Sequence, residues 1–186
     1  VDDDIEVYSS NDKNNLIGTF YTLRQQLMKR NDKPNLALSD YIAPKNTGHI
    51  DHIGIFCVTT GIGADKLSKY YENKNDDYNS IMVKALADRF AEAYAEYLHK
   101  KVRIEYWGYS PEEKLNNDDL IKEKYSGIRP APGYPACPDH LEKKTIWNIL
   151  NVEKNIGVSL TESLAMWPAS SVSGYYFANP SAKYFG

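Results

Sequence analysis

The sequence predicts a single α+β domain with a mostly antiparallel, twisted sheet and flanking helices. One observation behind this prediction is a run of apolar residues at helical spacing over residues 78–100. Another is a segment over residues 52–60 that is dense in Ile, Val, Phe and Thr, as buried strands are. The 186 residues also contain no linker, repeat or low-complexity segment, and a content of 42% hydrophobic and 25% charged residues suits one domain with a real core.

The N-terminal part is predicted to alternate strands and a helix. Four apolar residues at a 3.6-residue period predict a helix over Leu16–Met28: Leu16, Phe20, Leu23 and Leu27. A short strand over residues 4–8 precedes it, and a turn over Asn31–Asn35 follows. The buried strand over His52–Thr60 then ends at a Gly61-Ile62-Gly63 turn. This turn lacks the third glycine of the dinucleotide-binding fingerprint, so that function is rejected.

The longest predicted helix covers residues 78–100 and can be capped by Asp76 or Asp77. Its apolar stripe consists of Met82, Leu86, Phe90, Ala93 and Tyr97. Alanines along the same helix would let another element or a flat cofactor pack close, although alanine also favours helices by propensity alone. The remaining predicted elements are a half-exposed strand over Val102–Trp107, a short helix over Asn117–Tyr125, a helix over Leu141–Lys154, and strands with tight turns over Leu160–Phe185.

Charge and cysteine content exclude several classes of protein. A net charge of −3, with lysines and acids interspersed, disfavours nucleic acid as a partner. The acidic N-terminus has no secretory leader, and no apolar run reaches the length of a membrane span, which predicts a soluble, cytoplasmic protein without membrane contact. Cys57 and Cys137 are too few for a disulfide scaffold or a thiolate zinc site, so both are expected to be reduced.

The segment from Arg129 to His140 contains four prolines among its twelve residues. Each proline fixes its own φ and restricts the residue before it, so the segment loses little conformational freedom on binding. Arg129 offers a planar fork for a carboxylate, Gly133 permits close approach of a ligand to the main chain, and Tyr134 presents an aromatic face with a polar tip. A binding loop and a plain proline-rich surface connection are both compatible with these residue types.

Carboxylates supply the other candidate site residues. Asp88, Glu92 and Glu96 are spaced four residues apart, so they share one face of the predicted long helix, either as a functional surface or as an ordinary solvated face. Glu123 precedes Arg129 and could orient it or accept the amino group of an amino-acid ligand, or be a surface charge. His140 has no second histidine at metal-ligand spacing, so we predict no metal site. With no recognisable nucleophile motif, we assign no catalytic residue.

The stretch from Arg129 to Tyr134 resembles the Arg-x-x-x-Gly-Tyr signature of the C-terminal activation domain of cobalamin-dependent methionine synthase. Four further segments fall in the order that this family shows: Asn35–Pro44, Asp76–Arg89, Tyr106–Tyr109 and Ser171–Phe177. Five ordered segments over most of the chain argue against a chance match.

The resemblance implies a parent enzyme that transfers a methyl group from methyltetrahydrofolate to homocysteine through cobalamin. It further implies that this domain presents S-adenosylmethionine for reductive methylation of inactive cob(II)alamin, driven by flavodoxin or a related reductase. The positions that match the family's S-adenosylmethionine site are Arg129, Ala131, Gly133, Tyr134, Tyr184 and Phe185. Asp88 and Glu92 match acids that face the cobalamin-binding module, and Glu123 and His140 are candidates for a supporting role on that side.

Measured against that family, residues 1–186 form a partial domain. A preceding segment with an acidic ligand to S-adenosylmethionine and a terminal helix are expected to be missing. We therefore expect weakened binding and no methyltransferase activity from the chain alone. Two alternatives remain: a free-standing S-adenosylmethionine-binding protein, and a protein-interaction module without catalysis.

Overall fold

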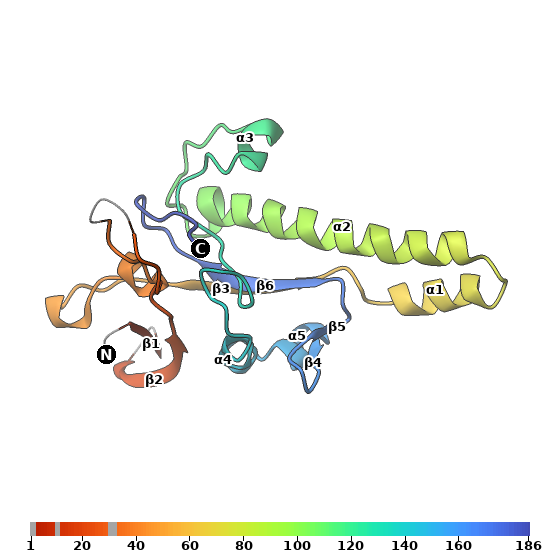
Figure 1. Ribbon diagram of the computed structural model, residues 1–186, viewed down its shortest axis with the longest axis horizontal. Coiled ribbons are helices and arrows are strands. Elements are labelled where there is room, and N and C mark those ends of the chain that lie inside the picture. Colours follow the sequence, from red (N-terminus) through yellow and green to blue (C-terminus); the bar gives the residue numbers. More distant parts are fainter. Residues whose placement is uncertain (1–2, 10–11, 30–32) are drawn as a thin grey trace.

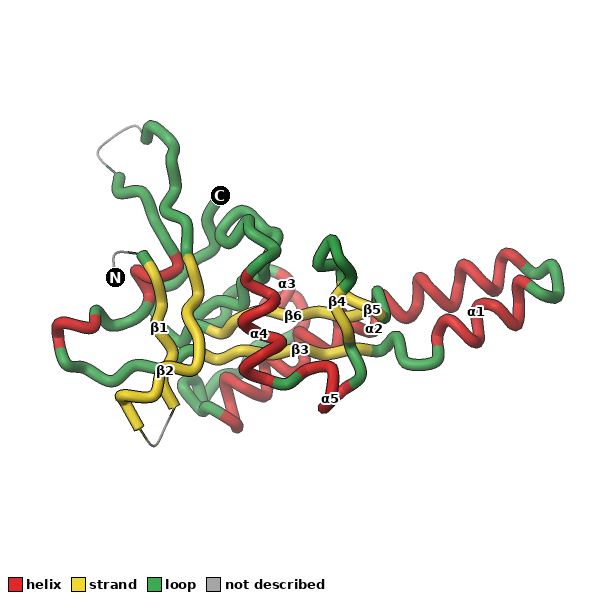
Figure 2. The backbone as a smooth tube through the Cα atoms, turned by 90° about the horizontal axis from the view of Figure 1, so that it is seen from below, coloured by secondary structure: helices red, strands yellow, loops and turns green. Residues whose placement is uncertain are grey.

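The computed structural model describes residues 3–9, 12–29 and 33–186. At its centre, β3 (Gly54–Thr59) pairs with β6 (Ser171–Tyr176) in a two-stranded antiparallel sheet. The helix α2 (Asp77–Lys101) packs on one face of this sheet and α4 (Glu142–Leu150) on the other (Figures 1 and 2). This arrangement of helices around antiparallel strands confirms the predicted α+β class.

Alternation along β3 and β6 divides the buried side chains between two clusters. Phe56, Val58 and Tyr176 belong to the cluster on the α2 side, together with Ala95. Their neighbours along the strands join a larger cluster on the opposite face, which includes Ile146 of α4. The central sheet therefore has a hydrophobic core on each face.

The remaining described strands form two further antiparallel pairs. β1 (Asp4–Ser9) pairs with β2 (Asp12–Tyr21), and β4 (Ser159–Leu160) pairs with β5 (Met166–Trp167). Within the described residues, the predicted antiparallel strands are thus distributed over three two-stranded sheets. Between β2 and β3 the chain forms two short 3-10 helices, over Leu38–Tyr41 and Lys45–Thr47.

The predicted helix over Leu16–Met28 is wrong. β2 extends to Tyr21, and residues 22–29 have no regular secondary structure. Phe20 is buried, whereas the three leucines of the predicted stripe are exposed. β-branched and aromatic residues around Phe20 favour a strand, and Gly18 disfavours a helix. Gly18 also packs against α4, since a Cβ there would lie 2.8 Å from Cδ1 of Ile149. The turn predicted over residues 31–35 falls partly outside the described residues.

The helix α1 (Ala64–Glu72) was not predicted from the sequence. α1 and α2 form a helical hairpin that projects beyond the central sheet (Figure 1). The side-chain oxygens of Ser68 and Ser80 lie 2.8 Å apart across the hairpin, and Lys84 pairs with Glu72 at 3.0 Å. Gly63, with a φ of 82°, occupies the N-cap of α1. The glycine that was weighed as part of a nucleotide motif is therefore a helix-start signal.

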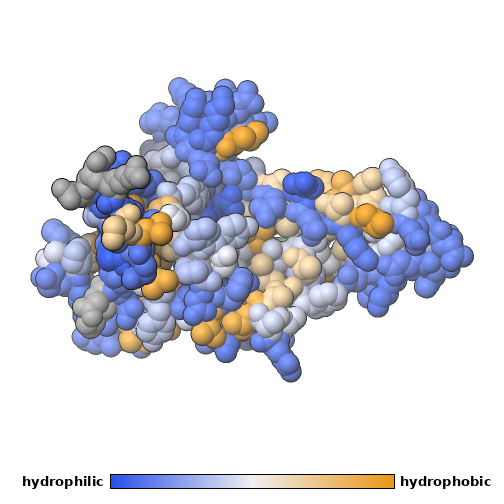
Figure 3. All heavy atoms as spheres, in the orientation of Figure 1, coloured by the Kyte–Doolittle hydropathy of each residue, from blue (hydrophilic) through white to orange (hydrophobic). Residues whose placement is uncertain are grey.

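The helix predicted over residues 78–100 is confirmed as α2. The side chain of Asp76 caps it by accepting a hydrogen bond of 3.1 Å from the main-chain N–H of Asn79. Its apolar stripe lies on the exposed side, where Phe90 is 61% exposed and Met82, Leu86 and Tyr97 are exposed as well. Figure 3 shows hydrophobic surface along part of the helical hairpin.

The face of α2 that packs on the sheet is made mostly of small residues, with His99 near its C-terminal end. Ala87, Ala91 and Ala95 are buried there, as expected of residues that allow another element to pack close. The rings of Phe56 and Tyr176 stack on this side of the sheet with centroids 4.7 Å apart. Because interiors are close-packed, the large rings on the sheet pack against small side chains along most of the helix, and His99 near the end of α2 stacks flat on Tyr176.

The predicted strand over Val102–Trp107 is wrong. The chain continues from α2 into a π-helical turn over Val102–Tyr106, in which the N–H groups of Trp107 and Gly108 both donate to the Val102 carbonyl at 3.0 and 3.1 Å. Arg103 is fully buried and pairs with Glu113 through hydrogen bonds of 2.7 and 2.8 Å. A charged side chain is buried this way only when it is paired, and its burial breaks the alternation on which the prediction rested.

The later elements largely follow the prediction. α3 (Asn117–Ile121) forms part of the predicted short helix. α4 is followed by α5 (Val152–Ile156), where one continuous helix was predicted, because Asn151 adopts a left-handed φ of 49° between them. β4, β5 and β6 occupy the region predicted to hold strands and turns. Within the described ranges, no helix is long and apolar enough to cross a bilayer.

Candidate functional site

The proline-rich loop of residues 129–140 begins alongside the central sheet. Ile128 and Phe177 exchange main-chain hydrogen bonds of 3.0 and 3.1 Å, and the N–H of Tyr175 donates to the carbonyl of Pro130 at 2.9 Å. Gly174 permits this approach, because a Cβ there would lie 2.5 Å from the Pro130 oxygen. The start of the loop is therefore fixed by main-chain hydrogen bonds as well as by its prolines.

A compact turn follows within the same loop. The N–H of Gly133 donates to the carbonyl of Cys137 at 2.7 Å, and the carbonyl of Ala131 accepts from the N–H of Tyr134 at 3.3 Å. Gly133 has a φ of 99°, and a Cβ at this position would lie 2.2 Å from Cε1 of His140. Glycine is thus required twice here, for its conformation and for the ring that packs on it. In the structure the close neighbour of Gly133 is the ring of His140.

Arg129 lies where the loop meets α2 and the C-terminal segment. Its Nη2 donates to Oε2 of Glu96 at 3.0 Å, and the two side chains are 16% and 29% exposed. Its main-chain N–H donates to the hydroxyl oxygen of Tyr184 at 2.9 Å, and that oxygen lies 3.2 Å from the hydroxyl of Tyr125. The structure thus brings Arg129 and Tyr184 together, although they are 55 residues apart in the chain.

Buried rings and charges support this arrangement from beneath. The guanidinium of Arg103 lies 4.3 Å from the centroid of the Tyr125 ring. His99 meets Tyr125 edge-on at 4.8 Å and stacks on Tyr176 at 5.1 Å. Burial, with smaller contributions from Arg103 and Arg129, lowers the pKa of His99 to about 2. His99 is therefore neutral at physiological pH and acts as a packed aromatic ring.

The two C-terminal aromatic residues of the predicted site have different surroundings. Tyr184 is exposed beside Arg129, whereas Phe185 packs against the main core with its ring centroid 6.4 Å from that of Tyr41. Tyr134 in the loop is 63% exposed. Tyr134 and Tyr184 therefore present exposed aromatic surface, and Phe185 holds the C-terminal segment in place.

The acids predicted for the site are divided between α2 and the segment just after α3. Asp88 accepts a hydrogen bond of 2.6 Å from Oγ of Ser170, and Glu92 is exposed one turn further along α2. Glu123 is exposed just beyond α3 with a φ of 52°. The carboxylate that the structure pairs with Arg129 is Glu96, which the spacing had placed on the acidic helix face but which was not assigned to the site.

The two cysteines are free thiols, as expected. Burial raises the pKa of Cys57 to about 12 and that of Cys137 to about 11. Both are therefore protonated at physiological pH, and a protonated thiol is a poor nucleophile. The groups that the loop and its surroundings offer, a guanidinium and exposed aromatic rings, suit the binding of a ligand.

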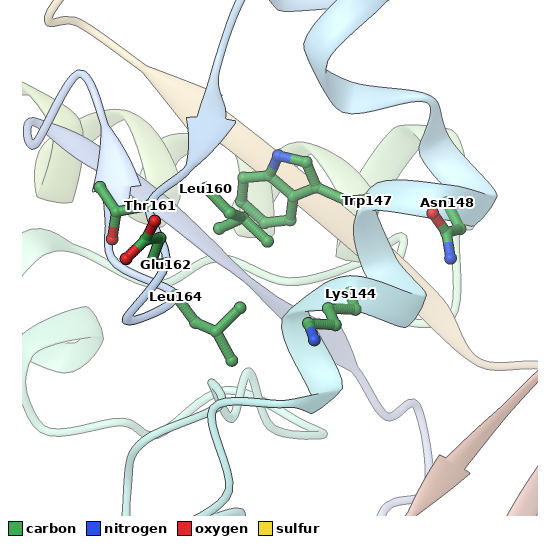
Figure 4. A pocket seen from close by; sticks show the side chains of 7 residues that line it. All are labelled: Lys144, Trp147, Asn148, Leu160, Thr161, Glu162 and Leu164. Atoms are coloured by element: carbon green, nitrogen blue, oxygen red, sulfur yellow. The ribbon is translucent and has the colours of Figure 1, made fainter.

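A separate hollow of about 360 Å³ lies between α4 and the turn that connects β4 to β5 (Figure 4). Its lining combines Trp147 and Lys144 of α4 with Leu160, Thr161, Glu162 and Leu164, and includes Asn148. The hollow is open, and its lining contains no residue of the proline-rich loop. We therefore place the candidate site at Arg129.

Comparison with known proteins gives two results. The family model described as vitamin B12 dependent methionine synthase, activation domain, matches residues 1–186. A solved structure described as the crystal structure of the MetH reactivation domain bound to AdoHcy is 56% identical in sequence and superposes with a TM-score of 0.96. The match covers 100% of this chain and 57% of that chain, so the present chain spans less than two thirds of its relative's length.

Proposed function

The chain belongs to the activation-domain family of vitamin B12-dependent methionine synthases, and on that premise we propose that it binds S-adenosylmethionine at the proline-rich loop. The observation that carries this proposal is the placement of Arg129 at the head of an anchored loop, with its guanidinium held by Glu96 and its main chain by Tyr184. A guanidinium fork presented in this way suits the carboxylate of an amino acid.

The surroundings of Arg129 suit the rest of such a ligand. Tyr134 and Tyr184 are exposed, and aromatic faces favour both a planar base and a sulfonium cation. The relative described as bound to AdoHcy holds a ligand with the same amino-acid and adenosine parts but without the methyl group. The loop loses little freedom on binding, because its prolines and its hydrogen bonds to β6 already fix it.

We propose that the parent enzyme is a cobalamin-dependent methyltransferase that makes methionine, and that this domain serves its reactivation. In this role Asp88 and Glu92 face the cobalamin-binding module, with Glu123 and His140 nearer the loop as supporting residues. Cobalamin would supply the methyl acceptor on that other module, and a flavodoxin or related reductase would supply the electron. The present chain contributes binding and presentation, and by itself it performs no methyl transfer.

We also place this function in the cytoplasm. Both cysteines are free thiols, which suits a reducing compartment.

Calorimetric titration with S-adenosylmethionine tests the binding proposal. Arg129→Ala should weaken binding by roughly 2 kcal/mol, or about thirtyfold, because a charge-assisted contact is lost. Arg129→Lys should restore only part of this, since an ammonium group lacks the planar fork. Arg89→Ala, which removes an exposed arginine from α2, is the matched control and should bind as the unmodified chain does. Equal affinity of the Arg129→Ala variant and the unmodified chain would refute the assignment.

The proposed cobalamin-side role of the acids is tested in the intact enzyme. The double variant Asp88→Ala, Glu92→Ala should recover slowly from the cob(II)alamin state while its melting temperature falls only modestly, because both side chains are exposed and one hydrogen bond, from Ser170 to Asp88, is lost. Recovery at the normal rate would show that these acids have no part in reactivation.

A further inference from the structure

We propose that Glu96 is the positioning residue of the ligand site, and that its carboxylate holds the Arg129 guanidinium in the orientation that receives the ligand's carboxylate. This inference rests on the proposed function, which makes Arg129 the carboxylate anchor. It adds a residue and a mechanism that neither the Arg-x-x-x-Gly-Tyr motif nor helix spacing reveals.

The placement of Glu96 suits it to this task. Its neighbour Ala95 is fully buried against the central sheet, so the main chain of α2 is fixed at this point. Arg129 reaches α2 from a loop that is itself fixed by hydrogen bonds to β6. The contact of 3.0 Å between Nη2 and Oε2 therefore connects two rigid elements across 33 residues of sequence. A long, flexible side chain held at both ends loses less entropy when it binds a ligand.

The partly exposed Arg129–Glu96 pair differs from the buried Arg103–Glu113 pair in a way that indicates function. Arg103 is fully buried and makes two hydrogen bonds to Glu113, so it is largely neutralised by its partner. Arg129 makes one hydrogen bond to Glu96, and both side chains remain partly exposed. A guanidinium has five N–H donors, so Arg129 keeps donors for a second carboxylate.

The pair is also incompletely satisfied. Nε of Arg129 and Oε1 of Glu96 are buried without a hydrogen-bond partner among the described residues. Nη1 of Arg103 is buried and unpaired as well, but the Arg103–Glu113 pair forms two hydrogen bonds, whereas the Arg129–Glu96 pair leaves its second one unformed at a cost in free energy. The single contact is what a positioning role requires, because it fixes the guanidinium while leaving part of its edge uncommitted.

Electrostatic repulsion would act against this positioning role, since Glu96 is negative and lies near the proposed position of the ligand's carboxylate. If repulsion dominated, removal of the charge would tighten binding. If positioning dominates, removal of the side chain loosens it, and a glutamine that keeps one oxygen acceptor has an intermediate effect. The two possibilities therefore predict changes of opposite sign.

The decisive experiment compares S-adenosylmethionine with decarboxylated S-adenosylmethionine, which lacks only the carboxylate. Both ligands are titrated into the unmodified chain and into the Glu96→Ala, Glu96→Gln and Glu105→Ala variants, with thermal melting of each protein. Glu105, which pairs with Lys101 and is half exposed, is the control for loss of a carboxylate elsewhere on the chain.

The unmodified chain should prefer S-adenosylmethionine over its decarboxylated form at least tenfold. Glu96→Ala should reduce that preference at least fivefold while changing the affinity for the decarboxylated ligand less than twofold. Glu96→Gln should retain part of the preference, and Glu105→Ala all of it. If Glu96 had a merely structural role, Glu96→Ala would weaken the binding of both ligands equally and leave the preference intact, and this result would overturn the inference. Tighter binding of S-adenosylmethionine by Glu96→Gln would overturn it as well. If the unmodified chain binds neither ligand or does not distinguish them, the proposed function itself fails.

Discussion

The buried histidine beneath the site is expected to make the fold sensitive to mild acid. His99 is fully buried, and burial lowers its pKa from 6.5 to about 2. The unfolded chain therefore takes up a proton below pH 6.5 that the folded chain refuses. Stability due to neutral His99 is fully present above pH 6.5 and is lost as the pH falls below that value. At 1.36 kcal/mol per pH unit, the loss reaches about 2 kcal/mol at pH 5.

Other titrating groups act mainly outside this window. Arg24 holds the pKa of Asp40 below its usual range, so the stability from that pair is lost only at lower pH. Burial raises the pKa of the Glu142 carboxyl above its ordinary value of 4.5. The stability that this group contributes is therefore fully present below pH 4.5 and is lost as the pH rises. This change partly opposes the effect of His99.

The assay is urea denaturation at pH 5.0, 6.0, 7.0 and 8.0. His99→Gln cannot become charged, and its amide can still meet the hydroxyl of Tyr109, which lies 3.3 Å from Nε2 of His99. This variant should be less stable at pH 7, because it loses the stacking on Tyr176, but should show a smaller drop between pH 6.5 and 5. His140→Gln, which removes an exposed histidine, should keep the normal drop. An unchanged drop in the His99→Gln variant would refute the linkage to this residue.

Four further substitutions test the packing of the fold and the loop. Leu86→Ala on the exposed face of α2 should cost less than about 1 kcal/mol in denaturation, whereas Ala91→Leu on the buried face should cost about 1–3 kcal/mol by overpacking; the reverse order would show that the faces are misassigned. Glu113→Gln should destabilise the fold by about 3 kcal/mol, because the charge of Arg103 stays buried with a weakened partner, and an unchanged denaturation midpoint would contradict this. Gly133→Ala should lower both the melting temperature and the affinity for S-adenosylmethionine, since its φ of 99° disfavours alanine and the added methyl meets a histidine ring; normal values in melting and titration would rule this out.

Elements with strong local signals were predicted well from the sequence. The long helix has a capping aspartate and an uninterrupted helical period, and the central strand is a continuous apolar run, so neither depends on a distant partner for its recognition. The predictions for residues 16–28 and 102–107 failed because the structure of these segments depends on distant partners. Phe20 is placed by pairing with β1, and Arg103 by an ion pair with Glu113. Such partners leave no periodic trace in the segment itself.

The residues of the candidate site also differ in whether the sequence alone could reveal them. The family resemblance pointed to Arg129 through the motif and to Tyr184 through a second segment, and the structure joins the two residues through a hydrogen bond. Spacing placed Glu96 on an acidic helix face with Asp88 and Glu92, but it could not distinguish the one acid that turns toward Arg129. That distinction depends on where the loop crosses α2, which is a property of the folded chain.

The orientation of α2 links these observations. Its sequence offers two faces that could be buried, one of large apolar residues and one of alanines, and hydrophobic periodicity favours the first. The structure buries the second face: the alanines fit against the side of the sheet that carries the stacked rings of Phe56 and Tyr176, and His99 stacks on Tyr176 near the end of the helix. The alanine face lets the helix lie close to the sheet, and only a close helix brings Glu96 within 3.0 Å of an arginine whose loop is hydrogen-bonded to β6. The alanines at the buried face therefore set the position of the site as well as the packing of the core.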